Sequence, residues 1–240
     1  MKTKIINNLF ELWKQLGSQG GFLYTTKQYN YVMPNNNSWP NKVFELESSP
    51  VNFKYLRHKL ENGSLPNSIS LLENEELEAQ LLQHHFSLRS IVKGMFLDIQ
   101  EKDKPIHDFS SIERVDNELK AREFANIASN SFGYEVLSST ISSSINSSQI
   151  KLFIGKHKSN YVSCGLILLD KNGISGLHMI GTISEYRGLG LGKIMTNKLL
   201  FEAYENKSNK VVLVASESGE RIYSKLGFKS DGVLKSYVLK

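Results

Sequence analysis

Apolar residues from Ile5 to Leu16 recur at the spacing that puts them on one broad face of a helix. The first 17 residues are therefore predicted to form an amphipathic helix. This segment has neither the continuous apolar run nor the small-residue cleavage site of a signal peptide. The pattern thus indicates an amphipathic surface helix and not an export signal.

Short β-rich and helical patterns alternate between residues 20 and 105. No catalytic motif occurs in this part of the sequence. The predicted strands are residues 21–26, 29–33, 42–46 and 94–99, the predicted helices are 53–60 and 73–84, and residues 34–41 form a turn or loop.

A polar, linker-like stretch from Gln100 to Pro105 follows, and its proline disfavours helix in the residue before it. A chain of 240 residues is also somewhat long for one domain of ordinary size. We therefore place a boundary near residue 105. It divides the chain into an N-terminal α/β domain, 1–105, and a second domain, 106–240.

The second domain reads as a mixed α/β layer structure. A good hairpin turn, Asn172-Gly173, precedes one of its strands, and Ser216 or Ser218 can cap a helix that stops at Gly227. The predicted helices are residues 116–131, 138–148, 191–206 and 216–226, and the predicted strands are 107–115, 151–156, 161–169, 174–183 and 211–215, with two short strands around Phe228 and Tyr237.

Composition narrows the class of protein. With 40% apolar and 22% charged residues the chain is globular. Its longest apolar runs, such as 165–169 and 211–215, are far shorter than the roughly 20 residues that span a bilayer. The single cysteine, Cys164, excludes an internal disulfide framework, and the histidines do not assemble at metal-ligand spacing. We expect a cytoplasmic protein that binds neither membrane nor metal.

The net charge of +5 is unevenly placed along the chain. From Arg187 to the C-terminus, ten Lys or Arg residues stand against five Asp or Glu residues. An anionic ligand would be attracted there. Aromatic residues do not alternate with these basic ones, so the segment does not form a stacking platform for nucleic-acid bases.

The run Arg187-Gly188-Leu189-Gly190-Leu191-Gly192 lies between a predicted strand and a predicted helix. Glycines at such a turn let backbone N–H groups approach an anion, and the positive end of the helix dipole adds attraction. A dinucleotide fingerprint would need a small residue where Lys193 stands. A P-loop would need glycine at 187 and Ser or Thr at 194. The run is therefore a phosphate cradle of another kind.

The run from Arg187 to Gly192 resembles the Arg/Gln-x-x-Gly-x-Gly/Ala motif of the GNAT superfamily of N-acetyltransferases. In that superfamily the motif binds the pyrophosphate of acetyl-CoA. Residues 216–228, SESGERIYSKLGF, resemble the second signature of that superfamily. One departure is Ser216, where many members have asparagine. The resemblance covers residues 106–240 and implies a mixed, mostly antiparallel central sheet flanked by helices. Residues 1–105 would then be a smaller α/β domain, and they faintly suggest a degenerate half of the same fold that forms part of the acceptor site.

The resemblance also implies roles for individual residues. Tyr223 would donate a proton to the sulfur of the departing CoA, since a phenol is protonated at neutral pH; the alternative is that it only packs on the apolar face of its helix. The implied acetyl-CoA contacts are Ile180, Thr182, Ile183, Arg187, Gly188, Leu189, Gly190, Leu191, Gly192, Lys193, Ser216 and Tyr223.

His178 lies on the strand before the cradle, where some superfamily members place an imidazole base. With an unperturbed pKa near 6.5 it could remove the proton of the substrate ammonium, or it could be a core histidine. Glu185 is a weaker candidate for the base. Cys164, in an apolar strand, is interpreted as a small buried residue.

The resulting hypothesis is an acetyl-CoA-dependent N-acetyltransferase that acts on the primary amine of a small or amino-acid-like molecule. The alternatives are an acyl-CoA-binding regulatory module and a protein or peptide N-acetyltransferase. A homodimer is a further possible assembly. Loop aromatics in the N-terminal part, such as Tyr31 and Trp39, are candidates for contacts with the acceptor.

Overall fold

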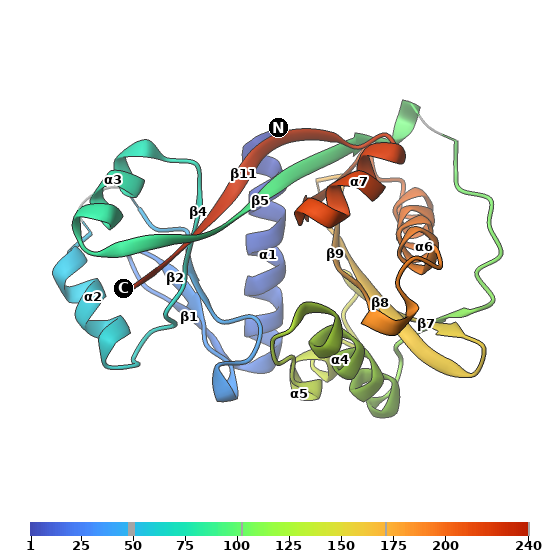
Figure 1. Cartoon of the computed structure of the whole chain (residues 1–240), viewed down its shortest axis with the longest axis horizontal. Coiled ribbons are helices and arrows are strands. Elements are labelled where there is room, and N and C mark those ends of the chain that lie inside the picture. The colour runs from blue at the N-terminus through green and yellow to red at the C-terminus, as the bar shows by residue number, and fades with distance from the viewer. Residues whose placement is uncertain (48–50, 102, 171, 240) are drawn as a thin grey trace.

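The computed structural model describes residues 1–47, 51–101, 103–170 and 172–239. They form one eleven-stranded sheet in the order β1-β2-β3-β4-β11-β5-β10-β9-β8-β7-β6, with helices on both faces (Figure 1). The strands are β1 Leu23–Thr25, β2 Asn30–Val32, β3 Lys42–Phe44, β4 Ile69–Leu72, β5 Phe86–Asp98, β6 Ile112–Arg114, β7 Ile150–His157, β8 Asn160–Leu169, β9 Ile174–Thr182, β10 Lys210–Ala215 and β11 Lys229–Leu239. The helices are α1 Lys2–Gly20, α2 Phe53–Glu61, α3 Glu75–Gln83, α4 Glu118–Phe132, α5 Ser138–Ser142, α6 Leu191–Glu205 and α7 Glu217–Lys225.

Most neighbouring strands in this sheet are antiparallel. The parallel pairs are β3 with β4 and β9 with β10, and each is joined by a crossover helix, α2 or α6. The predicted fold class, a mixed and mostly antiparallel sheet flanked by helices, is confirmed.

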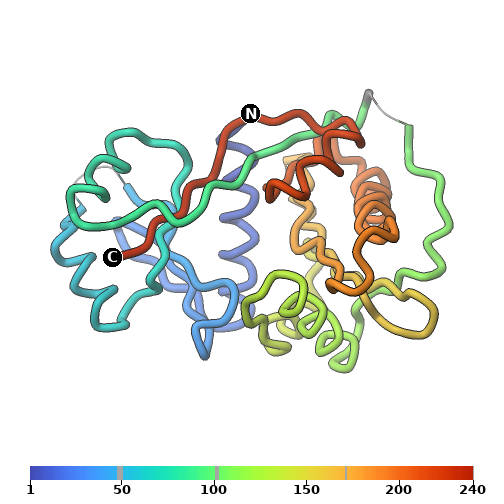
Figure 2. Tube along the Cα trace, viewed as in Figure 1, coloured from blue at the N-terminus to red at the C-terminus, as the bar shows by residue number. Residues whose placement is uncertain are grey.

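The order of strands is nearly symmetric about its centre. The sequence strand–helix–strand–helix–long strand occurs twice, as β3-α2-β4-α3-β5 and as β9-α6-β10-α7-β11. The two long strands exchange neighbours, because β5 pairs with β10 and β11 pairs with β4. They also pair with each other, and Figure 2 shows them running side by side across the middle of the molecule.

This exchange bears on the boundary predicted near residue 105. Strand β5 lies before the boundary in sequence, yet it is inserted between β10 and β11. A cut at 105 would leave β10 without its antiparallel neighbour. The ranges 1–105 and 106–240 therefore do not form separate sheets, although each carries one repeat of helices and strands.

Alternate residues of the strands contribute side chains to hydrophobic cores on the two faces of the sheet. One continuous core lies under α1, α4 and α5 and includes Leu12, Phe124 and Leu166. The other face carries two cores, one under α6 and α7 and one under α2 and α3. The sheet thus holds both halves of the chain against α1, and none of the helices in the described ranges is long and apolar enough to cross a membrane.

Some predicted elements differ in length from the observed ones. The two short strands expected near Phe228 and Tyr237 are one strand, β11, and the strand expected to start at Gly94 starts at Phe86. Both extensions lie in the long β5–β11 pairing, so the partner strand sets their length. The Ser-rich helix is confined to α5. Gly173, in the predicted hairpin turn, has the positive φ of 72° that a tight turn requires. Lys171, two residues earlier, lies outside the described residues.

Candidate active site

The glycine run forms the connection from β9 to α6. A short 3₁₀ turn, Ser184–Tyr186, leads into it, and α6 begins at Leu191 as predicted. Gly188 and Gly190 have φ values of 83° and 78°, a region that other residues enter at a cost. An atom added at either Cβ position would meet nothing within 4 Å, so the space around the loop is open.

The N-terminus of α6 lacks both a side-chain cap and acidic neighbours. Gly190 is its N-cap, no side chain caps the helix, and its first turn contains no acidic residue. The first N–H groups of the helix therefore have no capping partner. Gly192 has ordinary helical geometry, so its lack of a side chain serves to leave room beside these N–H groups.

The two signatures meet at this point in space. A Cβ at Gly192 would lie 3.9 Å from Thr182 Oγ1, at the end of β9, and 4.0 Å from Ile222 Cδ1, on α7. The cradle, the last residues of β9 and the helix that carries Tyr223 thus surround one site.

Arg187 has a structural role in the cradle. Its Nε donates to the carbonyl of Thr182 (3.1 Å) and its Nη2 donates to the carbonyl of Ser131 (2.9 Å). The guanidinium therefore ties the loop to β9 and to α4. These bonds use two of the five N–H donors of the guanidinium, and the predicted direct contact of this side chain with a ligand stays a prediction.

Strands β9 and β10 separate beside the cradle. Their pairing extends from Ile174–Lys210 only to Gly176–Val212, although β9 continues to Thr182. Beyond that point Met179 has a left-handed φ of 52°, and the register with β8 shifts there. The end of β9 is therefore open on its β10 side, and a β-bulge turns the local backbone.

Tyr223 is buried in the core under α6 and α7, with 9% of its surface exposed. Its hydroxyl forms no hydrogen bond with the described residues and is not among the fully enclosed polar atoms, so it faces accessible space. Burial raises its pKa to about 12. The phenol is therefore protonated at neutral pH, as a proton donor must be.

His178 lies on the face of β9 that packs against α1, opposite to the face covered by α6 and α7. Its ring is 6% exposed and its Nε2 is hydrogen-bonded to Asn8 Oδ1 at 2.9 Å. Burial lowers the pKa of His178 to about 3. The prediction that His178 is the general base is not supported, because a buried imidazole of such low basicity neither reaches a substrate nor takes its proton at neutral pH.

His178 should instead make stability depend on pH. Its pKa is lower in the folded state than the unfolded value near 6.5, so only the unfolded state takes up this proton between about pH 6.5 and pH 3, and stability falls on acidification. We expect wild type to lose about 2 kcal/mol more than His178→Gln between pH 8 and pH 5, in urea unfolding at each pH. Equal losses in the two proteins would contradict the buried neutral state.

The remaining predicted residues have identifiable surroundings. Ser216 caps α7 by accepting from the Gly219 N–H. Cys164 is buried, which confirms its interpretation as a small buried residue, and burial raises the pKa of its thiol to about 12. Hydrogen bonds from its own backbone N–H and from Ser184 lower the pKa of Glu185, so it is a poor base.

The α4–α5 loop lies over the bulge of β9, where Tyr134 Oη is 3.9 Å from Met179 Sδ. A residue of the N-terminal half, Trp39, reaches the same loop: its backbone N–H donates to the carbonyl of Glu135 at 2.8 Å. Sequence reasoning missed this link and the Asn8–His178 pair. Neither has a local signal, because the partners are far apart in sequence.

A cavity of about 450 Å³ lies beside the cradle, between α4, the β7–β8 turn and the end of β9. Ile183 and Tyr186, which precede the glycine run, form part of its wall, and Glu123 is its carboxylate. This carboxylate makes the cavity a poor place for phosphates. Among the described residues no cluster of three metal-ligating side chains occurs.

Comparisons with known proteins agree with this geometry. A profile described as an acetyltransferase (GNAT) domain matches residues 115–236. Among solved structures, a GCN5-related N-acetyltransferase from Kribbella flavida has a TM-score of 0.66 at 16% identity, covering 90% of this chain and 88% of that one. A putative GNAT acetyltransferase from Novosphingobium aromaticivorans has a TM-score of 0.64 at 13% identity, with 97% and 94% coverage.

A third similar structure is a glucosamine N-acetyltransferase region of a fungal multi-domain GH3 β-N-acetylglucosaminidase. Its TM-score is 0.55 at 13% identity, with 77% of this chain and 26% of that chain covered. These identities show a shared fold and leave the substrate open. The profile, in contrast, spans about half of the chain and includes both the cradle and Tyr223, so the protein belongs to the GNAT acetyltransferase family.

Proposed function

We propose that this chain is an acetyl-CoA-dependent N-acetyltransferase that transfers the acetyl group directly to a primary amine of a small or amino-acid-like molecule. The observation that carries this proposal is the convergence of three features: the uncapped N-terminus of α6, the opening between β9 and β10, and the accessible hydroxyl of Tyr223.

The residues present fit acetyl-CoA as the co-substrate. The N–H groups of Leu191, Gly192 and Lys193 would hold its pyrophosphate at the positive end of α6. Ser216 and the open edge of β9 would lie along its pantetheine arm. The thioester supplies an activated acetyl group, and the chain supplies its orientation.

Acetyl transfer needs stabilisation of an oxyanion and a proton for the departing thiolate. Backbone N–H groups of β9 beyond Gly176 are not paired with β10 and can donate to the oxyanion. The Tyr223 hydroxyl can give its proton to the sulfur, and the proton that the attacking nitrogen loses would restore the phenol. Neither His178 nor Glu185 is a suitable base. The ammonium form of the acceptor would therefore lose its proton to water, and the acceptor would enter the site as a neutral amine.

The acceptor site would be formed by the α4–α5 loop together with the N-terminal half. Tyr134 and Met179 lie beside the opening, and Trp39 fixes the loop from the other half. Phe132 stacks on Tyr134 with ring centroids 5.6 Å apart, which gives the loop a partly apolar face. Such a wall would select acceptors with an apolar body next to the amine.

The test is turnover of acetyl-CoA, read as free thiol, with three groups of acceptors. These are free amines including amino acids and glucosamine, peptides with free N-termini or lysines, and a blank without acceptor. Turnover on free amines supports the proposal. Turnover only on peptides would favour a protein or peptide acetyltransferase, and tight acetyl-CoA binding with no turnover on any acceptor would favour a regulatory module.

Trp39→Ala should raise the acceptor KM severalfold while the acetyl-CoA KM changes little. The reason is that the Trp39 side chain packs against the core under α1, α4 and α5, so its loss should loosen the segment whose backbone pairs with the loop beside the opening. Tyr31→Ala is the matched control, because Tyr31 lines a different cavity. An unchanged acceptor KM in Trp39→Ala, with the thermal midpoint preserved, would rule out this role.

A further inference from the structure

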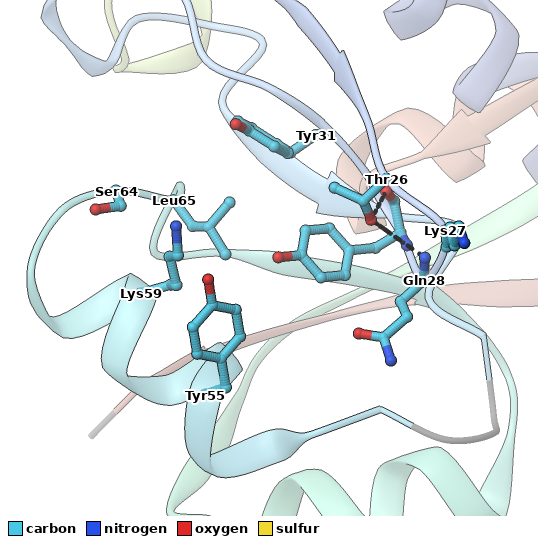
Figure 3. Close-up of a pocket in the computed structure, with 9 residues that line it drawn as sticks. Thr26, Lys27, Gln28, Tyr31, Tyr55, Lys59, Ser64 and Leu65 are labelled. Carbon is cyan, nitrogen blue, oxygen red and sulfur yellow. Dashed lines mark hydrogen bonds between the residues drawn. The ribbon is translucent and has the colours of Figure 1, made fainter.

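A second cavity, of about 370 Å³, lies in the N-terminal half, away from the cradle. It is bounded by the β1–β2 turn, by α2 and by the loop that follows α2 (Figure 3). Tyr31 lies on one side of this space and Tyr55 and Lys59 lie on the other. No residue of the acetyl-CoA site lines it, so the proposed acetyl transfer does not account for it.

The walls of this cavity are held in place by the fold. Thr26 Oγ1 donates to the carbonyl of Tyr29 at 2.7 Å and accepts from the N–H of Tyr29 at 3.0 Å, which fixes the turn. The Tyr31 ring stacks on Tyr24 at 4.7 Å with an interplanar angle of 12°. Leu65, 4% exposed, adds an apolar wall. The site is therefore preformed, and its volume suits a small ligand.

Three tyrosine hydroxyls and one lysine ammonium of the cavity are the groups that could bind a ligand. In the part of the chain that the structure describes, the hydroxyls of Tyr29, Tyr31 and Tyr55 form no hydrogen bond. The Lys59 ammonium forms no ion pair there and lies 5.4 Å from the centre of the Tyr55 ring. Burial raises the pKa of Tyr29 and of Tyr31, which keeps both phenols protonated. The Lys59 ammonium and three phenol hydroxyls thus line the same space, and Lys27 adds a second positive charge to its wall.

The chemistry of a ligand follows from this set. Among the described residues no Asp or Glu lines the cavity, so an ammonium group would enter without a counter-charge and beside Lys59. The amine acceptor of the proposed reaction therefore does not belong here. A carboxylate would pair with Lys59 and accept charge-assisted hydrogen bonds from the phenols. The tyrosine rings and Leu65 offer flat apolar surface for a planar body.

We propose that this cavity is a second binding site, specific for a small aromatic carboxylate whose charged end lies at Lys59 and whose ring packs between the tyrosines. The inference does not depend on the proposed acetyl transfer, because the cradle and Tyr223 lie elsewhere.

The experiment is a calorimetric titration of the full chain with benzoate as the probe. Benzamide has the same shape without the charge, benzylamine carries the opposite charge, and inorganic phosphate is an anion without a ring. We expect benzoate to bind at least about tenfold more tightly than each of the other three. Saturating acetyl-CoA should leave the benzoate affinity unchanged. Displacement by acetyl-CoA, or equal binding of phosphate or benzylamine, would overturn the proposal.

Substitutions on one helix locate the site. Lys59→Gln should weaken benzoate binding at least about tenfold, since it removes the charge and shortens the side chain by only one atom. Tyr55→Phe, at a residue that is 52% exposed, should weaken it about threefold without disturbing the fold. Lys54→Gln, on the same helix but outside the cavity, is the control and should bind as wild type. Wild-type affinity in Lys59→Gln would overturn the proposal.

Discussion

Replacing Gly190 with aspartate should weaken acetyl-CoA binding by at least about 10²-fold. Its Cβ position faces open space beside the uncapped N-terminus of α6, where the phosphates would lie. Two unit charges 4 Å apart repel by roughly 4 kcal/mol at an effective dielectric constant near 20, which corresponds to about 10³-fold in affinity. Calorimetric titration with acetyl-CoA measures the loss.

Gly190→Asn is the matched control. Asparagine has the size of aspartate and is also tolerated at the left-handed φ of 78°, but it carries no charge. We expect it to lose much less affinity than Gly190→Asp, and both proteins should keep the thermal midpoint of wild type within a few degrees. A folded Gly190→Asp protein with wild-type affinity would remove the cradle from the acetyl-CoA site.

Tyr223→Phe should lower kcat by about 10²-fold, the effect of losing a general acid. The acetyl-CoA dissociation constant should change less than threefold, because a proton given to the leaving sulfur acts mainly in the transition state. The hydroxyl has no hydrogen-bond partner in the described residues, so the variant should fold normally. Turnover kinetics with saturating acceptor and a separate binding titration distinguish the two effects.

Tyr204→Phe serves as the control for removal of a phenol. Tyr204 is near the C-terminal end of α6, where its hydroxyl donates to the carbonyl of Ile99, far along the helix from the cradle. It should retain wild-type kcat. If Tyr223→Phe also retained it, Tyr223 would be a packing residue of the core under α6 and α7, which is the alternative that the sequence left open.

The cradle and the elements around it could be predicted from the sequence because their signals are local. Alternating glycines require particular backbone conformations, and the helix of α6 starts one residue after Gly190 as its apolar period predicts. The cap at Ser216 is likewise set by residues a single turn apart. Such features depend on neighbours in the chain, so sequence pattern and structure agree.

The environment of the His178 side chain could not be predicted from the sequence. The sequence places His178 correctly on β9. Its imidazole, however, is hydrogen-bonded to Asn8, which is 170 residues away in the sequence. Only the packing of α1 on the sheet decides that this imidazole is buried. The same packing gives it a low pKa, so its chemistry is set by a residue that no motif indicates.

By itself the sequence indicated the family and the fold class through its resemblance to two signatures, and it determined the glycine turn before α6 and most helices, which follow from local spacing and backbone preference. The tertiary structure alone decided that β5 and β11 exchange between the halves, that α1 buries His178, and that Trp39 meets the α4–α5 loop. These features join residues distant in the chain through sheet pairing and side-chain burial. Their free energy arises only when the whole core assembles, so no local pattern encodes them.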